Sequence, residues 1–298
     1  MLTKMSEYTT VKFSDSYGLA DSIWKILFET SQSDVDHMFE IYFYPCCEHR
    51  AYQLAKPNRW TLLHRFIHCY YWDSYEAFEH YRDDMRDLII TEYEAVLNFY
   101  EIPYPRFDIP EEMSEDYDRK TAEAICSLRS LLPSVRIVHD TFQLLFGDRA
   151  SLMKFNQGIA RVVRDHLKKQ DYPEIVESDG VLCRVYLPIW VKRAVFYRDK
   201  GRCVVCGKDL TGTILTGEEV HYDHMVPLAE GGANDPTNFQ LMCRNCNLSK
   251  AQKTGTSDKY QTYWNLDDKS LIEARRYFEG RVGSPVWLGC VQENDEAA

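Results

Sequence analysis

Two Cys-x-x-Cys pairs constrain the fold of this chain more than any other feature of its 298 residues. Cys203 and Cys206 form the first pair, Cys243 and Cys246 form the second, and 36 residues lie between Cys206 and Cys243. Each pair can bring two thiolates to one ion at about 2.3 Å, and two pairs complete the closed tetrahedral shell of a structural zinc. Because four sulfurs leave no open position for water, we expect this zinc to stabilise the fold and any chemistry to lie elsewhere.

Polar residues that suit chemistry lie between and just beyond these pairs. They are Asp223, His224, Asn238 and Asn247. The residues 220–222 have strand character, PLAEGGANDPTN is rich in turn-forming residues, and CRNCNLSKAQK is typical of a short helix. The pattern predicts a strand, a loop, a second strand and a helix.

In this stretch the chain resembles the HNH endonucleases. Their ββα-metal motif has an Asp-His pair on the first strand, an Asn in the loop and a metal-binding Asn or His on the helix. Asp223, His224, Asn238 and Asn247 fall on those positions, at intervals of 14 residues from His224 to Asn238 and 23 from His224 to Asn247. The resemblance covers about residues 191–253 and implies a zinc-stapled nuclease domain.

The chemistry of phosphodiester cleavage suggests a role for each polar residue. His224, with an ordinary pKa near about 6.5, can accept a proton from water at neutral pH. Asp223 and Asn247 offer hard oxygen ligands suited to Mg²⁺ or Mn²⁺. Asn238 can brace the loop through side-chain to backbone hydrogen bonds, and so orient His224. The family resemblance implies the same division of labour.

Three further residues are candidates for the site. His221 lies two residues before Asp223, so on a strand both side chains would face the same side, where His221 could contact metal or phosphate. A surface or structural histidine is the alternative. Arg244 and Lys250, in the expected helix, are the other two candidates.

Two other functions fit the cysteine spacing. A zinc ribbon or treble clef that binds nucleic acid without catalysis would carry the same four cysteines. An RNA-cleaving toxin could use the same catalytic residues. The Asp-His pair and the two asparagines favour a nuclease, and the resemblance favours DNA as its substrate. By analogy alone, such a nuclease serves phage defence or a mobile element.

The remainder of the chain predicts an α+β protein with three parts. Residues 1–184 form a mainly helical domain, 185–256 the HNH domain and 257–298 a helical extension. Residues 135–146 are ambiguous between strand and helix. Apolar spacing, caps and proline stops predict helices over 17–28, 61–72, 75–100, 117–132, 151–169 (with Ser151 as its cap) and 188–199.

Charge is divided unevenly along the chain. Its net charge is −11, yet residues 184–256 hold ten Lys and Arg against seven Asp and Glu, a net of +3, so the rest carries −14. Lys and Arg supply most nucleic-acid affinity, so the acidic, aromatic-rich domain of residues 1–184 is poorly suited to bind nucleic acid itself. We therefore expect it to bind a protein partner or copies of itself, or to mask the nuclease. On that basis a fragment from about Pro188 to Thr256 should cut DNA without regulation, or bind it more tightly at low salt than the full chain does.

The composition of the chain, its other Cys and His residues and its acidic pairs do not predict a further functional site. The chain has no run of 18 apolar residues and its start lacks an apolar signal core, so we expect a cytoplasmic protein with no membrane segment. A second metal site would need regular ligand spacing, which Cys46, Cys47, His49, His64, His68 and Cys69 lack. Two acidic pairs, Asp83–Asp84 and Glu111–Glu112, are typical of solvated acids.

Overall fold

The computed structural model describes residues 14–81, 86–110, 114, 116–212 and 220–257. The chain divides into two compact units, residues 1–261 and 262–298, and the second lies outside the described residues. The expected C-terminal helix and the acidic pairs Asp83–Asp84 and Glu111–Glu112 also lie outside them.

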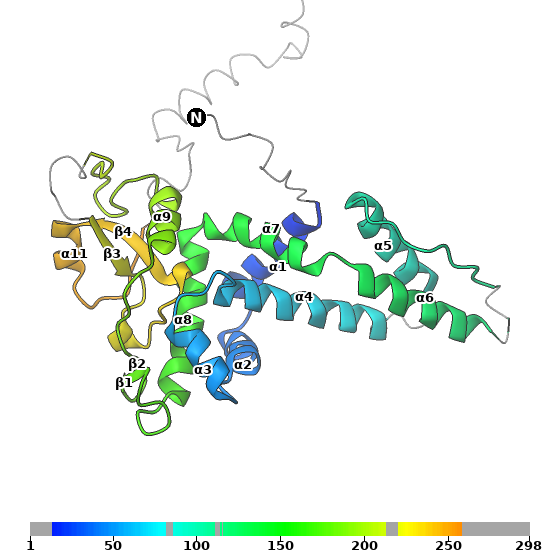
Figure 1. Cartoon of the computed structure of the whole chain (residues 1–298), viewed down its shortest axis with the longest axis horizontal. Helices are drawn as coiled ribbons and strands as arrows, with labels where there is room; N and C mark the ends of the chain where they lie inside the picture. Colours follow the sequence, from blue (N-terminus) through cyan, green and yellow to red (C-terminus); the bar gives the residue numbers. More distant parts are fainter. Residues whose placement is uncertain (1–13, 82–85, 111–113, 115, 213–219, 258–298) are drawn as a thin grey trace, which may run out of the picture. The chain divides into compact units, whose positions relative to one another are not determined.

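The first unit is mainly helical, with small sheets near its C-terminal end (Figure 1). Up to residue 166 the described residues form helices α1 (Ser14–Glu29), α2 (Gln32–Phe43), α3 (Glu48–Ala55), α4 (Leu62–Tyr81), α5 (Arg86–Phe99), α6 (Tyr117–Leu131), α7 (Ser134–Phe146) and α8 (Arg149–His166).

Between α8 and residue 257 the described residues form two antiparallel hairpins and the helices α9 and α11. Their bounds are β1 (Val176–Ser178), β2 (Val181–Leu182), α9 (Ile189–Arg198), β3 (Val220–His224), β4 (Phe239–Cys243) and α11 (Arg244–Lys250). β1 pairs with β2, and β3 pairs with β4 from Val220 opposite Cys243 to His224 opposite Phe239. Two short 3-10 helices, η3 (Leu228–Glu230) and η4 (Pro236–Asn238), shape the loop between β3 and β4.

Most expected helices are present, but some of their boundaries differ. The break expected between residues 72 and 75 is wrong, because α4 continues through it and the Ser74 hydroxyl donates to the Tyr71 carbonyl, 2.7 Å away within the helix. The ambiguous segment 135–146 is the helix α7, whose buried residues recur at helical spacing. α8 begins before Ser151, because the Asp148 carboxylate accepts hydrogen bonds from the amides of Ala150 and Ser151.

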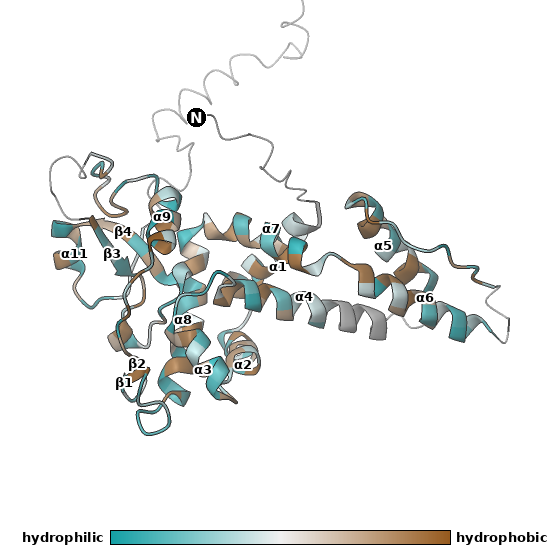
Figure 2. Cartoon of the chain, in the orientation of Figure 1, coloured by the Kyte–Doolittle hydropathy of each residue, from teal (hydrophilic) through white to brown (hydrophobic). Residues whose placement is uncertain are grey.

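Three hydrophobic cores hold the elements together. The first lies among α1, α2, α3, α4, α7 and α8 and continues under β1 and β2. The second joins α5 and α6 to α7, and the third lies among α9, β3, β4 and the buried cysteines. Many helices carry hydrophobic and hydrophilic residues on different sides, as burial against these cores requires (Figure 2).

A buried ion-pair network joins α8, the end of α9 and β4. The Asp199 side chain is fully buried and lies 3.1 Å from the Arg149 guanidinium and 2.9 Å from that of Arg198. Asp199 also accepts a hydrogen bond from the Leu241 amide at 2.8 Å. Breaking such a buried pair costs about 3–5 kcal/mol, so this network holds β4 against the helices.

The loop from Gly231 to Asn238 is buried throughout, although loops usually run over the surface. At Gly231 the backbone φ is +84°, and a Cβ there would lie 2.5 Å from the Ala160 carbonyl oxygen in α8. Only glycine combines this left-handed conformation with such a close approach. The loop is therefore pressed against α8.

Side chains of this buried loop bind the helices on which it lies. The Asn234 side chain donates to the Ala55 carbonyl at the end of α3, at 3.0 Å. The Asp235 carboxylate accepts from the Leu62 amide at 2.9 Å, which satisfies a free N–H at the start of α4. In α8, Asn156 donates to the Thr237 hydroxyl at 3.1 Å. Helices of the N-terminal region thus hold the β3–β4 loop in place.

Candidate active site and zinc centre

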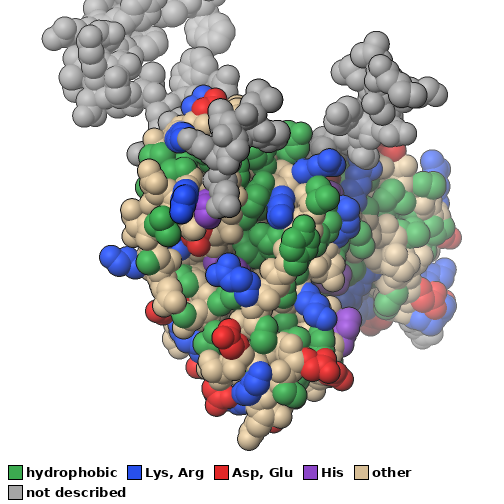
Figure 3. Space-filling view, turned by 60° about the vertical axis from the view of Figure 1, so that its left-hand side comes forward, with side chains coloured by type: hydrophobic (Ala, Val, Ile, Leu, Met, Phe, Trp, Pro, Cys, Tyr) green, Lys and Arg blue, Asp and Glu red, His purple; other side chains and the backbone are tan. Residues whose placement is uncertain are grey.

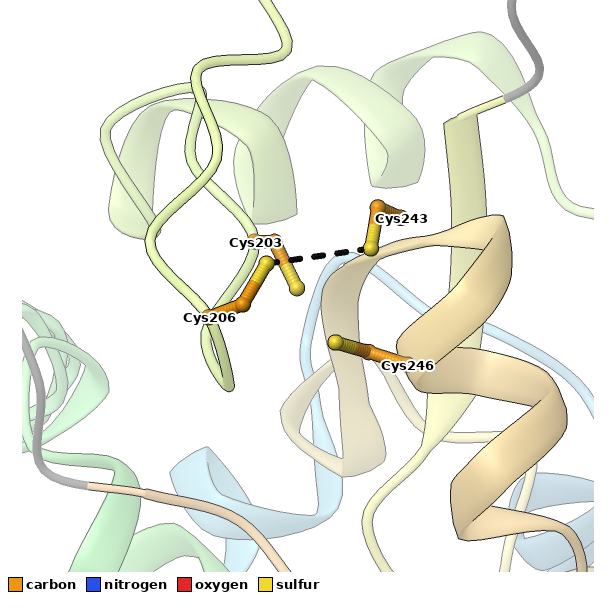
Figure 4. Close-up of side chains that lie close together, drawn as sticks. All are labelled: Cys203, Cys206, Cys243 and Cys246. Carbon is orange, nitrogen blue, oxygen red and sulfur yellow. Dashed lines mark hydrogen bonds between the residues drawn. The ribbon is translucent and has the colours of Figure 1, made fainter.

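The four cysteines of the two Cys-x-x-Cys pairs converge on one point (Figure 4). Their Sγ atoms all lie within 4.8 Å of one another, and those of Cys206 and Cys243 are 3.8 Å apart. Tetrahedral zinc with bonds of about 2.3 Å would set its sulfurs about 3.8 Å apart. The group could therefore hold a zinc ion, with ligands from the turn after α9, the end of β4 and the first turn of α11.

Crowding of the thiols also favours a cation. The pKa of Cys246 is raised, first by burial and then by the three neighbouring thiols. Burial also acts to raise the pKa of Cys203, but hydrogen bonds to its sulfur outweigh burial and lower the pKa to about 7. A bound cation would favour deprotonation of the neighbouring thiols, because thiolates are its ligands.

Strand β3 and helix α11 face each other through two pairs of side chains. Asp223 Oδ2 lies 2.8 Å from Lys250 Nζ, and Asn247 Nδ2 lies 3.2 Å from His221 Nδ1. Lys250 Nζ also donates to the His224 carbonyl oxygen at 2.8 Å. His221, Asp223, Asn247 and Lys250, four of the residues proposed from sequence, therefore lie on one side of β3 against α11.

Two oxygens in this group remain available for a cation. Asp223 Oδ1 and Asn247 Oδ1 accept no hydrogen bond from the part of the chain that the structure describes. Carboxylate and amide oxygens are ligands that Mg²⁺ and Mn²⁺ prefer. The donor set thus fits a hard divalent cation, and Lys250 is a competing positive charge on the same carboxylate.

His224 is buried at the end of β3, with 4% of its surface exposed. Its ring packs against Phe239, with the ring centres 4.4 Å apart, and its Nε2 lies 3.2 Å from Asn234 Oδ1. Burial, aided by the charges of Arg184 and Lys250, lowers the pKa of His224 to about 4, although Asn234 and Asp223 act to raise it. The imidazole is therefore neutral near pH 7.

Asn234 determines which nitrogen of His224 carries the proton. Its Nδ2 donates to two carbonyl oxygens, those of Ala55 at 3.0 Å and Cys183 at 2.9 Å. The amide orientation follows from these two acceptors, so the Oδ1 must face His224 and accept from Nε2–H. The lone pair of the neutral ring is then on Nδ1.

Asn238 lies inside the loop that follows β3. Its Oδ1 accepts from the Val226 amide at 2.9 Å, and its Nδ2 donates to the carbonyls of Val226 and Ala233 at 2.9 and 3.0 Å. Its own carbonyl accepts from the Met225 amide at 2.7 Å. The side chain therefore binds backbone on both sides of the loop, and the backbone beside His224 is held with it.

The remaining candidates from sequence lie apart. Arg244 is exposed at the first position of α11 and makes no hydrogen bond or ion pair with the described residues. His64 stacks between Trp60 and Phe142, and His49 and His68 bond Gln53 and Trp72. Within the described residues, Cys203, Cys206, Cys243 and Cys246 are the one group of three or more His, Cys, Asp or Glu side chains close enough together to hold an ion.

Sequence reasoning missed two residues near His224. Asn234 reads as an ordinary turn residue, and Arg184 lies well before the motif. No local spacing pattern could have identified either one, because the hydrogen bond of Asn234 to His224 and the effect of the Arg184 charge on His224 depend on how distant segments pack. None of the helices in the described residues combines the length and apolarity needed to cross a lipid bilayer.

Comparison with known families identifies part of the chain. A family model described as HNH endonuclease matches residues 203–253, which confirms the resemblance seen in the sequence, and the N-terminal region has no family match. No curated protein and no solved structure matches the chain.

Proposed function

We propose that this chain is a metal-dependent HNH endonuclease that hydrolyses phosphodiester bonds, with DNA as its substrate. The observation that carries the proposal is the state of His224: a neutral imidazole whose Nε2–H is fixed by Asn234, next in sequence to Asp223 on β3. The family match supports a nuclease in general. A zinc module that only binds nucleic acid would have no use for this arrangement.

The proposed reaction uses His224 as the general base. Nδ1 accepts a proton from a water molecule while the water oxygen forms a bond to phosphorus. The bond from phosphorus to the leaving oxygen breaks, and that oxygen takes a proton from solvent. Asn234 keeps the Nε2–H tautomer throughout, and Asn238 keeps the backbone of the loop in place.

Asp223 and Asn247 are the residues proposed to hold Mg²⁺ or Mn²⁺. When bound, the cation supplies positive charge to the phosphate and to the leaving oxygen. Lys250 and His221, which bond these two side chains, orient them for that task. The cysteines hold a zinc that keeps α11 beside the turn after α9, so that β3, β4 and α11 form a ββα-metal module.

The same proposal assigns a role to the remainder of the chain. Residues 1–184 form the helical domain that supports the β3–β4 loop, residues 185–256 the nuclease domain and residues 257–298 an extension. The acidic surface of residues 1–184 is the proposed site for a protein partner or for self-association. Phage defence or mobility of a genetic element is the proposed setting, and the cytoplasm the proposed compartment.

The test is cleavage of plasmid DNA and of total RNA by purified full-length protein, with Mg²⁺ or Mn²⁺ and with EDTA. We expect metal-dependent cleavage of DNA, and a loss of about 10² to 10⁴ in rate for His224→Ala, the range attributable to a general base. Zinc content and melting temperature are measured for each variant, so that a loss of rate is separated from a loss of fold or zinc.

His37→Ala is the matched control, because His37 is exposed on α2 and lies in none of the contacts described here. Equal cleavage by His224→Ala and the parent would refute the proposed mechanism. Cleavage of RNA alone would favour the ribonuclease alternative. Binding of nucleic acid without cleavage under any metal condition would favour the non-catalytic zinc protein.

A further inference from the structure

The connection between β2 and α9 is joined to His224 through Asn234. The Cys183 carbonyl accepts from Asn234 Nδ2 at 2.9 Å, and the same Asn234 side chain contacts His224. The next residue, Arg184, is exposed, and its charge is among those that lower the pKa of His224. Among the described residues, its guanidinium has no hydrogen-bond or ion-pair partner, and its charge acts on His224.

Two aromatic rings with cations over them follow along the same segment, the exposed Tyr186 and the partly buried Trp190. Tyr186 is 80% exposed, and Lys192 Nζ lies 4.9 Å from the centre of its ring. Arg59 lies over the Trp190 ring, with its guanidinium carbon 4.9 Å from the ring centre. One face of each ring is near a positive charge, and the high exposure of Tyr186 leaves its ring accessible to a ligand.

The surface of this segment is positive, although the whole chain is acidic. Residues 184–200 contain five Lys and Arg and one acid, Asp199, which is buried in an ion pair with Arg198. The charged side chains that this segment leaves accessible to solvent are therefore basic: Arg184, Lys192, Arg193 and Lys200. Figure 3 shows Lys and Arg side chains around exposed hydrophobic ones on the face that includes this region.

A duplex and a single strand would use such a surface differently. In a duplex the faces of each base are covered by neighbouring bases, and proteins mostly contact phosphates and base edges. Unpaired bases expose their faces and stack on aromatic side chains, while basic residues follow the backbone. An open tyrosine ring among cations suits the second case.

We propose that the β2–α9 connection and α9 form a docking surface for single-stranded nucleic acid, with Tyr186 stacking on an unpaired base and Arg184, Lys192 and Arg193 contacting phosphates. The strand then leads toward His224, because the connection begins at Cys183, which Asn234 joins to His224. This inference rests on the proposed nuclease function and narrows its substrate to unpaired or locally opened strands. It also explains how an acidic protein holds a polyanion, because the basic residues are gathered beside the active site.

The test measures binding apart from cleavage. Full-length protein carrying His224→Ala is titrated with fluorescent oligonucleotides of about 20 nucleotides, longer than most single-strand site sizes: oligo-dT, oligo-rU and a mixed-sequence duplex. We expect tighter binding of the single strands than of the duplex. Adding Tyr186→Ala should weaken single-strand binding about 5- to 100-fold, and Tyr186→Phe, which keeps the ring, should restore it.

Charge variants test the phosphate contacts. Lys192→Ala and Arg193→Ala should each weaken binding to all strands and reduce the slope of log affinity against log salt by about 1. Tyr17→Ala and Lys120→Ala, which remove an exposed tyrosine from α1 and a lysine from α6, are the matched controls and should change neither quantity. Arg184→Ala should slow cleavage in the active parent, and Arg184→Lys should recover part of the rate.

The outcomes separate this inference from the proposed function. Single-strand binding that depends on Tyr186, in a protein that cuts nothing, would support the surface and refute the nuclease. Metal-dependent cleavage with equal affinity for duplex and single strand, unchanged by Tyr186→Ala, would support the nuclease and overturn the surface. No detectable binding of any oligonucleotide would also overturn it.

Discussion

Asn234 connects three separate segments through one side chain. It accepts from His224 and donates to Ala55 and Cys183, so all its hydrogen-bonding positions but one lone pair are used. Without this side chain, the carbonyls of Ala55 and Cys183 would lose their hydrogen-bond donor, and the imidazole would be free to rotate. The orientation of the candidate base therefore depends on residues outside the matched motif.

We predict that Asn234→Ala lowers the cleavage rate about 10- to 100-fold, as loss of an orienting partner commonly does. It should also reduce the free energy of unfolding by about 1–3 kcal/mol, through unsatisfied buried polar groups. Cleavage kinetics and denaturant unfolding measure the two effects.

Asn156→Ala is the control for that prediction. It breaks the bond between α8 and Thr237 in the same loop, but Asn156 does not touch His224. Its stability should fall while the rate of the folded enzyme stays near the parental value. Equal loss of rate in both variants would mean that the loop, and not the imidazole, is what Asn234 serves.

His64 makes stability depend on pH. Burial, and then the charge of His139, lowers the pKa of His64 from 6.5 to about 3. Between these values the unfolded chain binds a proton that the folded chain does not, so this contribution to stability is present above about pH 6.5 and is lost as pH falls toward 3.

We predict that the free energy of unfolding falls less between pH 7 and pH 5 in His64→Asn than in the parent, when each protein is compared with its own value at pH 7. An asparagine can still accept from the Thr61 amide, as His64 Nδ1 does at 3.2 Å. Urea titrations at several pH values provide the slopes. His37→Asn, at an exposed position, should keep the parental slope; identical slopes in all three proteins would contradict the assignment.

At the scale of elements, the cluster of four cysteines joins the turn after α9 to β4 and α11. The elements it links are short: α11 runs only from Arg244 to Lys250 and β3 only from Val220 to His224. Helices of this length are marginal alone, so tertiary contacts must hold them. A metal ion bound by the four cysteines would be the strongest such link between these elements.

We predict one zinc per chain, and a fall in melting temperature of about 5 °C or more for Cys243→Ser or after chelation, because metal binding and folding are coupled in small sites. Metal analysis and thermal unfolding test this. Cys126→Ser, at an exposed position on α6, should keep both zinc and melting temperature. A zinc-free Cys243→Ser protein as stable as the parent would show that the metal is not structural.

At the scale of the whole molecule, the nuclease segment and the N-terminal helices share a buried interface. The loop of residues 231–238 bonds α3, α4 and α8, and Met225 and Ala233 belong to the first hydrophobic core. This contact changes the expectation, drawn from charge, that a fragment of about residues 188–256 would work alone.

We predict that this fragment folds poorly and cuts DNA at least about tenfold more slowly than the full chain, since its buried polar loop would lose its partners. Circular dichroism, thermal unfolding and cleavage rates, with zinc supplied, measure this. A fragment with a cooperative transition and parental activity would restore the regulatory interpretation, in which the helices only mask the nuclease.

The sequence by itself determined the features that depend on short spacing. The four zinc-site cysteines could be identified because two-residue intervals set how thiols meet, and most helices because apolar residues recur along them. The Asp-His pair and the asparagines could be aligned with a family motif for the same reason. The predicted ends of helices were less accurate than their existence. More than one nearby residue can cap a helix: α8 is capped by Asp148, although Ser151 was equally suitable from the sequence.

Only the tertiary structure decided how the candidate site is completed. The partners of Asn234 lie 179 and 51 residues away in the chain, and the cap that Asp235 provides for α4 spans 173 residues. Such contacts follow from the packing of helices around a common core, which no interval in the sequence records. The tautomer of His224, the burial of the loop and the effect of the Arg184 charge on His224 all arise at that level.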